Sequence, residues 1–270
     1  MNIVQKEIFG EVEAFQLGFG PVGRPLMSVY MYWIDGHLID TGQRNMQVSV
    51  LRLLAAKKIE GVLLTHHHED HSGNAAGIRK VYGVDVAGHP ETSRLMKDGF
   101  GIRPYQLYVW GRADHTEVAP FGRFYETERF RFRPIHTPGH SSDHTVFLEE
   151  SRGWLFSGDL YLGDKIKYFR ADEQLAEQID SLKKVLRFDF DALFCAHRPC
   201  LRDGKTRLKN KLSFLEDFYG NILAMMQKGY SEREIIRMLS AGQDKLVRWV
   251  TLGNVSFANM IRSAFRSARA

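Results

Sequence analysis

Residues 65–71 read Thr65-His66-His67-His68-Glu69-Asp70-His71 and contain the pattern H-x-H-x-D-H. The short apolar run at residues 61–65 leads into this pattern and predicts a buried strand. Several imidazoles and a carboxylate are therefore expected to gather around one point, on a loop that leaves the strand. Neutral imidazole and carboxylate are ligands that divalent zinc and iron prefer. We interpret this segment as part of a metal site.

Further side chains of ligand type follow other predicted strands. The sequence T-P-G-H ends at His140, F-S-G-D ends at Asp159, and A-H-R-P surrounds His197. Each lies in a turn with Gly or Pro, where bends of the backbone aim side chains at a shared site. Asp40 ends another predicted strand. A chance cluster of surface histidines, the alternative interpretation, does not explain these additional ligands.

Taken in order, these residues resemble the five motifs of the metallo-β-lactamase fold superfamily, which span residues 40–197 here. The resemblance implies an α/β fold, an αββα sandwich with the site on one edge, and a binuclear centre. It implies that Asp40 orients the ligand loop from outside the ligand set. The metal ligands that it implies are His66, His68 and His140 for the first ion, Asp70, His71 and His197 for the second, and Asp159 as the bridge.

Two divalent metal ions are the implied cofactors, expected as Zn²⁺, with iron and manganese as alternatives that the same ligands suit. A water shared by two such ions loses a proton near neutral pH, and the resulting hydroxide is the expected nucleophile. Coordination of a carbonyl or phosphoryl oxygen then stabilises the developing negative charge. Asp70, which can orient the hydroxide, and the bridging Asp159 are the expected catalytic residues. The true β-lactamases usually include a cysteine at these places, so antibiotic hydrolysis is not expected.

The rest of the chain reads as alternating strands and helices that give way to helices alone. Residues 29–40 predict two strands joined at Asp35-Gly36, and a strand is predicted at 84–87. After His197, apolar residues recur at helical spacing, and Ser231 to Glu234 form a capping box. We predict a catalytic domain over residues 1–200 and a C-terminal helical region over residues 201–270. The other predicted segments are helices at 46–58, 74–81 and 172–186 and strands at 129–135, 145–149, 153–156 and 192–195.

Several other side chains keep two interpretations. His67 is expected to point away from its ligating neighbours. His136 and His144 flank His140 and are expected to be hydrogen-bonded residues of the core or residues that support the ligands. Tyr161 follows Asp159 by two residues and is a candidate donor to a substrate carbonyl, with a packing role as the alternative.

Composition limits the partners. The 270 residues include 37 Lys and Arg against 32 Asp and Glu, a formal net charge of +5, which is small for a chain that binds nucleic acid. Residues 198–211 alone carry this +5, with six basic residues against the single acid Asp203. Arg198, Arg202 and Lys205 are therefore candidates to bind an acidic group of a small substrate. The alternative is a solvated loop that enters a helix.

Three substrate classes share such a metal site: thioesters, lactones and other esters, and phosphodiesters. The C-terminal helices resemble the tails of both glyoxalase II and the β-lactamase-like-protein-2 group. We predict a hydrolase of a small anionic thioester or ester, with a phosphodiesterase or ribonuclease as the alternative. A non-catalytic sensor is disfavoured because every ligand is present.

The expected location is the cytoplasm. Residues 1–7 carry two charges where a secretory signal needs an apolar core, two cysteines form no disulfide framework, and no apolar run is long enough to span a membrane. A nucleic-acid partner and homo-oligomers stay open.

Overall fold

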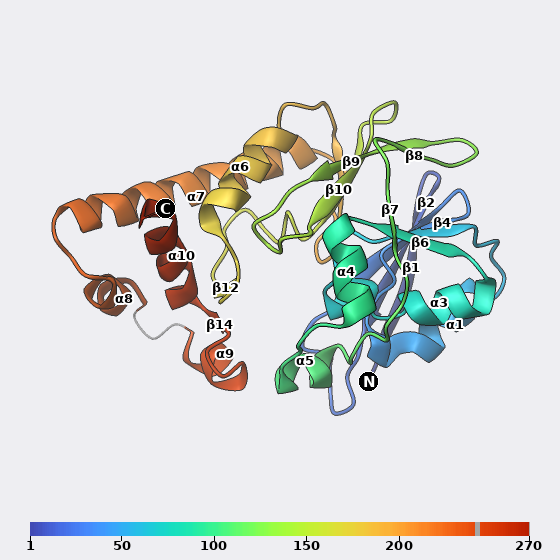
Figure 1. The fold of residues 1–270 in the computed structure, drawn as a ribbon, viewed down its shortest axis with the longest axis horizontal. Helices are drawn as coiled ribbons and strands as arrows, with labels where there is room; N and C mark the ends of the chain where they lie inside the picture. Colours follow the sequence, from blue (N-terminus) through green and yellow to red (C-terminus); the bar gives the residue numbers. More distant parts are fainter. Residues whose placement is uncertain (241–243, 270) are drawn as a thin grey trace.

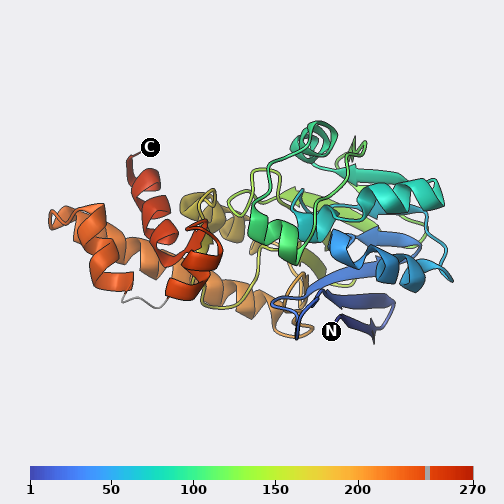
Figure 2. The same ribbon diagram turned by 90° about the horizontal axis from the view of Figure 1, so that it is seen from below.

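The computed structural model describes residues 1–240 and 244–269. Two β-sheets lie face to face, with helices on both outer sides (Figures 1 and 2). The first sheet runs in chain order through β1 (Ile3–Phe9), β2 (Val12–Gly18), β3 (Val29–Ile34), β4 (His37–Ile39), β5 (Gly61–Leu63), β6 (Asp85–Gly88) and β7 (Ala119–Pro120). The second has the order β13 (Ala192–Cys195), β11 (Trp154–Gly158), β10 (Thr145–Glu149), β9 (Arg131–His136) and β8 (Tyr125–Glu126). A two-stranded sheet pairs β12 (Phe169–Arg170) with β14 (Val255–Ser256).

Strand periodicity explains the layers, because successive side chains point to opposite faces of a sheet. In β10, Phe147 faces the space between the sheets, while Val146 and Leu148 face the outer helices. Both faces of the central strands are therefore apolar. The space between the sheets is filled mainly by buried aromatic side chains of the second sheet: Phe130, Phe132, Phe147, Phe156 and Phe194.

Helices cover each outer face. The first sheet packs against α1 (Gln47–Leu54), α3 (Ala75–Tyr82) and α4 (Pro90–Asp98). The second sheet shares one apolar cluster with α6 (Leu175–Val185), α7 (Gly204–Gln227), α8 (Glu232–Ser240) and α10 (Phe257–Arg269). The short helices are η1 (Arg44–Met46), α2 (Glu69–Ser72), α5 (Pro104–Val109) and α9 (Lys245–Val250). This arrangement confirms the predicted αββα sandwich with C-terminal helices.

The C-terminal helices extend sideways from the sandwich (Figure 1), with the long α7 running from the second sheet outward. Residues 201–270 were predicted to be helical; of these, residues 241–243 and 270 lie outside the described residues. Among the residues that the structure describes, no helix has both the length and the apolar character needed to cross a bilayer.

Candidate metal centre

The strands bring the predicted ligands to one edge of the sandwich. Asp40 directly follows β4, and the loop with His66 follows β5, which is parallel to β4. In the second sheet, Asp159 directly follows β11, and His197 lies two residues beyond β13, which is parallel to β11. Because parallel strands end at the same edge of a sheet, each pair of loops meets there.

The seven predicted metal ligands form two adjacent groups. His66, His68 and His140 make the first group, and Asp70, His71, Asp159 and His197 make the second. Within each group, one ligand-type atom from every residue lies within 4.8 Å of the others. His197 is the only member that is more than marginally exposed, with 12% of its side chain accessible.

In the first group, three imidazole nitrogens converge. His66 Nε2 lies 2.9 Å from His68 Nδ1, and His140 Nε2 lies 3.1 Å from the same atom. Neutral imidazole has one N–H and one lone pair, so three converging nitrogens cannot all be satisfied by one another. A divalent cation bound by three lone pairs resolves this conflict, and nitrogen donors of this kind suit zinc. The residues therefore fit a metal ion.

The Asp159 carboxylate lies between the two groups. Its Oδ2 is 3.2 Å from His140 Nε2, and its Oδ1 is 3.5 Å from Nε2 of both His71 and His197. Asp70 Oδ2 is 3.3 Å from His197 Nε2 and thus joins the second group. Among the described residues, the buried atoms His71 Nε2 and Asp159 Oδ1 have no hydrogen-bond partner. Such atoms fit a cation at the second group as well.

Outer partners fix the orientation of several imidazoles. Asp40 accepts hydrogen bonds from the Thr65 backbone N–H at 2.8 Å and from His71 Nδ1 at 2.7 Å. His197 Nδ1 donates to the Ser28 carbonyl oxygen at 2.7 Å. With a proton on Nδ1, the Nε2 lone pair of His71 and of His197 is left for a metal. Asp40 therefore contacts both the ligand loop and His71, and its role in orienting them stays a prediction.

The electrostatics differ between the groups. Burial, together with the neighbouring imidazoles, lowers the pKa of His66 well below its usual value, so its neutral, metal-binding form is favoured. Burial also acts to lower the pKa of His71, but Asp40, Asp70 and Asp159 outweigh it and raise that pKa. The negative field that favours a proton on His71 also favours a metal cation at the second group.

The candidate substrate residues are dispersed. Arg198 and Arg202 are exposed, whereas Lys205 Nζ lies 2.7 Å from Asp189 Oδ1. Tyr161 is buried, and its hydroxyl donates to Asp164 Oδ1 at 2.5 Å. Tyr161 was a candidate donor to a substrate carbonyl, but the one proton of its hydroxyl already has an acceptor within the protein. This contact favours the alternative, a packing role.

Some residues that support the ligands were not identified from the sequence. Thr65 Oγ1 contacts both Asp40 and His66, and Asp143 accepts from the backbone N–H and Nδ1 of His67, as expected for a histidine turned away from the ligands. Glu173 Oε2 lies 3.7 Å from His140 Nδ1. The position of Thr65, next to the histidines, was a usable signal; the 32 residues between His140 and Glu173 offer none.

The predicted neighbours of His140 have different environments. His144 is buried, with Nε2 accepting from the Asp159 backbone N–H at 3.0 Å and Nδ1 facing Thr137 Oγ1 at 2.8 Å. His136 is exposed, and its Nε2 lies 2.8 Å from the Ser142 carbonyl oxygen. His144 is therefore a hydrogen-bonded core residue, as expected, whereas His136 forms a hydrogen bond but is exposed and lies outside the core.

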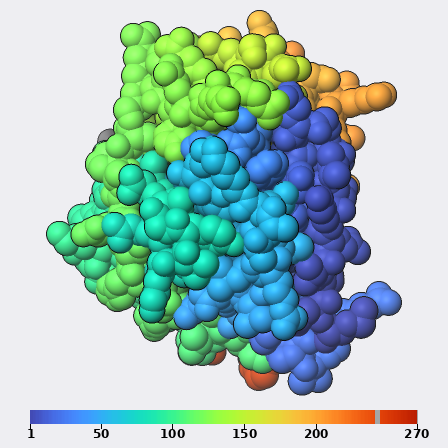
Figure 3. All heavy atoms as spheres, turned by 90° about the vertical axis from the view of Figure 1, so that its right-hand side faces the viewer, coloured from blue at the N-terminus to red at the C-terminus, as the bar shows by residue number. Residues whose placement is uncertain are grey.

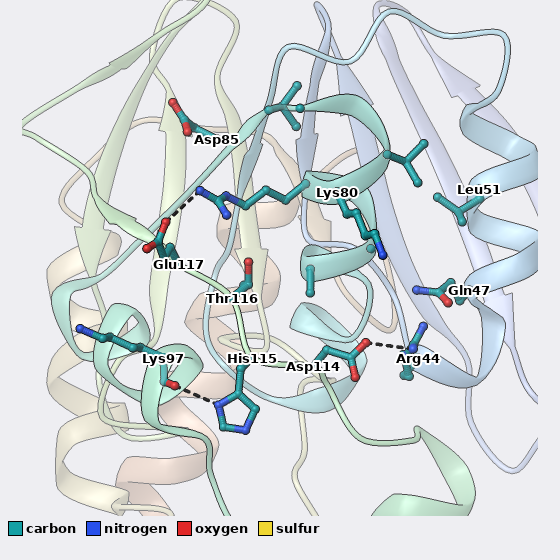
Figure 4. Close-up of a pocket in the computed structure, with 16 residues that line it drawn as sticks. Arg44, Gln47, Leu51, Lys80, Asp85, Lys97, Asp114, His115, Thr116 and Glu117 are labelled. Carbon is teal, nitrogen blue, oxygen red and sulfur yellow. Dashed lines mark hydrogen bonds and ion pairs between the residues drawn. The ribbon is translucent and has the colours of Figure 1, made fainter.

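A separate groove of about 1090 Å³ lies beside α1 and α3 (Figure 4), elements that form part of the face seen in Figure 3. Basic and acidic side chains of its lining pair with one another, as in Arg44–Asp114 and Arg79–Glu117, both at 2.9 Å. No residue of either ligand group lines this groove. This groove, whose lining residues are drawn in Figure 4, is therefore distinct from the candidate metal centre.

The fold and this site place the chain in the metallo-β-lactamase class. Residues 27–197 match the family described as the Metallo-beta-lactamase superfamily, and the chain belongs to that superfamily. It is 30% identical over 202 residues to a Beta-lactamase-like protein 2 homolog of Drosophila melanogaster, covering 67% of this chain and 62% of that protein. It is 27% identical over 206 residues to Lactamase-like protein notP of an Aspergillus species, covering 75% and 54%. The chain thus spans little more than half the length of these relatives.

Solved structures agree on the fold. A metallo-beta-lactamase family protein of Thermus thermophilus matches with a TM-score of 0.67 and 20% identity, over 95% of this chain and 94% of that one. A beta-lactamase domain protein of Burkholderia ambifaria matches with a TM-score of 0.70 and 15% identity, over 97% and 88%. Both matches extend well beyond residues 27–197, so they include C-terminal helices.

Proposed function

We propose that this protein is a binuclear metal-dependent hydrolase that cleaves a thioester or ester bond in a small anionic substrate. The position of Asp159 supports the binuclear centre most directly. One of its oxygens faces the first ligand group and the other faces the second. A single metal site would leave one of these two sets of converging donors without a cation. We expect Zn²⁺ in both positions, with iron or manganese as the alternatives.

In this proposal, His66, His68 and His140 hold one ion, Asp70, His71 and His197 hold the other, and Asp159 contacts both. When bound, the ions would lower the pKa of a coordinated water and would polarise the substrate carbonyl. Asp70 stays ionised, since its pKa is lowered: burial raises that pKa, but His71 and His197 outweigh it. As a carboxylate, Asp70 accepts a hydrogen bond from the attacking water and orients it.

Thioesters are favoured over phosphodiesters by one relative. The chain is 30% identical over 180 residues to a protein of Aspergillus fumigatus named Atrochrysone carboxyl ACP thioesterase, covering 65% of this chain and 38% of that protein. The leaving group of a thioester gives a second reason. A thiol has a pKa of about 8.5, so it leaves as thiolate without a dedicated proton donor. We propose exposed Arg198, next to His197 in the chain, as a contact for the acidic group of the substrate.

The proposal is tested by metal analysis and substrate assays. Purified protein is expected to contain two ions per chain and to hydrolyse S-lactoylglutathione or another acyl thioester, with activity lost on chelation. Bis-p-nitrophenyl phosphate and a short RNA are the competing substrates. Turnover of the phosphodiesters alone would show that the alternative, a phosphodiesterase or ribonuclease, is correct.

The substrate's acidic group is tested separately. Arg198→Gln is expected to raise KM for an anionic thioester about tenfold while leaving kcat unchanged, since the contact is made equally in the ground state and the transition state. Lys80→Gln, which makes the same change of charge in the groove of Figure 4, is the matched control. Equal KM values for the two variants would show that Arg198 does not contact the substrate.

A further inference from the structure

The turn that carries Asp159 is held by contacts at each of its backbone positions. Gly158 has the left-handed φ of +47°, and its carbonyl oxygen accepts from the Ala196 N–H at 3.1 Å. The Asp159 N–H donates to His144 Nε2 at 3.0 Å. These two contacts come from the sandwich. The carbonyl of Leu160, the residue after Asp159, has its partner in the C-terminal helices.

That partner is Lys211, which belongs to α7 and is 1% exposed. Its Nζ donates to the Leu160 carbonyl oxygen at 2.7 Å. A buried ammonium group is costly to desolvate, and apolar replacements of buried charges are often neutral or stabilising. Stability alone therefore gives a weak reason for a lysine at this position. A requirement to fix the Leu160 carbonyl gives a stronger one.

A second contact joins the same helix face to the same segment. Arg207 Nη1 and Asn210 Nδ2 each lie 3.1 Å from Asp164 Oδ2. Positions 207, 210 and 211 are three and four residues apart, so they share one face of α7. This face therefore contacts the segment after Asp159 at both of its ends, Leu160 and Asp164.

We propose that Lys211 is a positioning residue for Asp159, and that α7 thereby contributes to metal binding as well as to the fold. The inference rests on the metal centre of the proposed function. Movement of the Leu160 carbonyl displaces the Asp159 carboxylate, because only one peptide unit separates them. Since Asp159 faces both ligand groups, such a displacement is expected to weaken metal binding at both groups.

The test is a zinc titration of the apoprotein against a chromophoric chelator, with thermal unfolding of the same apo samples. Lys211→Met keeps the length of the side chain and removes the donor. It is expected to weaken zinc binding 10- to 100-fold, the range typical of residues that support metal ligands, without lowering the unfolding temperature of the apoprotein. Lys209→Met makes the same substitution at an exposed position of the same helix and is expected to bind zinc as the wild type does.

Asp164→Asn is the second variant, since it changes a partly exposed side chain at the other end of the segment and leaves the core intact. It is expected to weaken zinc binding about threefold to tenfold. Wild-type zinc affinity in both Lys211→Met and Asp164→Asn would overturn the inference. If the wild-type protein itself bound no metal, the proposed function would fail instead, so the two failures are distinguishable.

Discussion

Replacing Asp40 with Asn tests how the metal centre is oriented. Oδ1 of Asp40 accepts from the Thr65 N–H at 2.8 Å, and Oδ2 accepts from His71 Nδ1 at 2.7 Å. An asparagine amide has one oxygen and one NH₂, so either orientation sets a donor against one of these two N–H groups. The conflict with Thr65 has no remedy, because a backbone N–H keeps its proton. The conflict with His71 is relieved if its proton moves to Nε2.

That proton shift removes the lone pair which His71 directs at the second ligand group. We expect Asp40→Asn to weaken zinc binding there by 10- to 100-fold, or about 1.4–2.7 kcal/mol. Asn tolerates the left-handed φ of +60° found at Asp40, so the backbone is retained. Asp40→Ala is expected to be worse, because it leaves two buried donors unpaired at about 1–3 kcal/mol each.

The assay is zinc competition with a chromophoric chelator, together with urea unfolding of the apoprotein. Asp114→Asn, which alters the exposed pair with Arg44, is the matched control. Wild-type zinc affinity in Asp40→Asn would refute the role assigned to the Asp40–His71 hydrogen bond. A loss of affinity matched by unfolding of the apoprotein would refute it as well, since the effect would then be structural.

Three further outcomes are expected. Gly158→Ala places a Cβ 2.8 Å from His144 Nε2 at a left-handed φ, and we expect urea unfolding to show a loss of about 2–4 kcal/mol. Burial raises the pKa of Asp35, but hydrogen bonds from Thr127 and Arg129 outweigh it and lower that pKa to about 2. Asp35 should therefore contribute about 1–2 kcal/mol of stability above pH 4 that is lost as the pH falls towards 2, and unfolding of Asp35→Asn should lack this dependence. Removal of metal by a chelator should lower the unfolding temperature, because bound metal stabilises the folded state. With free zinc at 1,000 times Kd, the metal contributes about 4 kcal/mol to the free energy of unfolding. An unchanged unfolding temperature would contradict a structural contribution of the ions.

That the seven candidate ligands lie close together was predictable because the signals are local, and their role as metal ligands stays a prediction. His66 after β5 and Asp159 after β11 are side chains of suitable chemistry that follow short apolar strands. Asp70 and His71 follow the same strand β5 but lie on the short helix α2. Within each sheet, neighbouring parallel strands bring the residues that follow them to the same edge. The division into residues 1–200 and 201–270 stays a prediction.

Other features were not predictable in the same way. Strand β1 is largely exposed at the edge of its sheet, so it lacks the alternation of apolar residues that identifies a strand. The basic residues of 198–211 looked like one cluster along the chain. In the structure Lys205 pairs with Asp189, Arg207 pairs with Asp164, and Lys211 is buried on the Leu160 carbonyl, because each residue of a helix is rotated by about 100° from the last.

The sequence by itself determined the class of fold and the residues gathered at its metal-binding edge, since both depend on residue type, strand periodicity and turn composition within short segments. Only the tertiary structure decided which atoms support those residues. Asp40 reaches His71 across 31 positions, and Lys211 reaches Leu160 across 51. Contacts of this kind depend on how separate elements pack and on which way each side chain is turned, and neither is encoded in the pattern of any one segment.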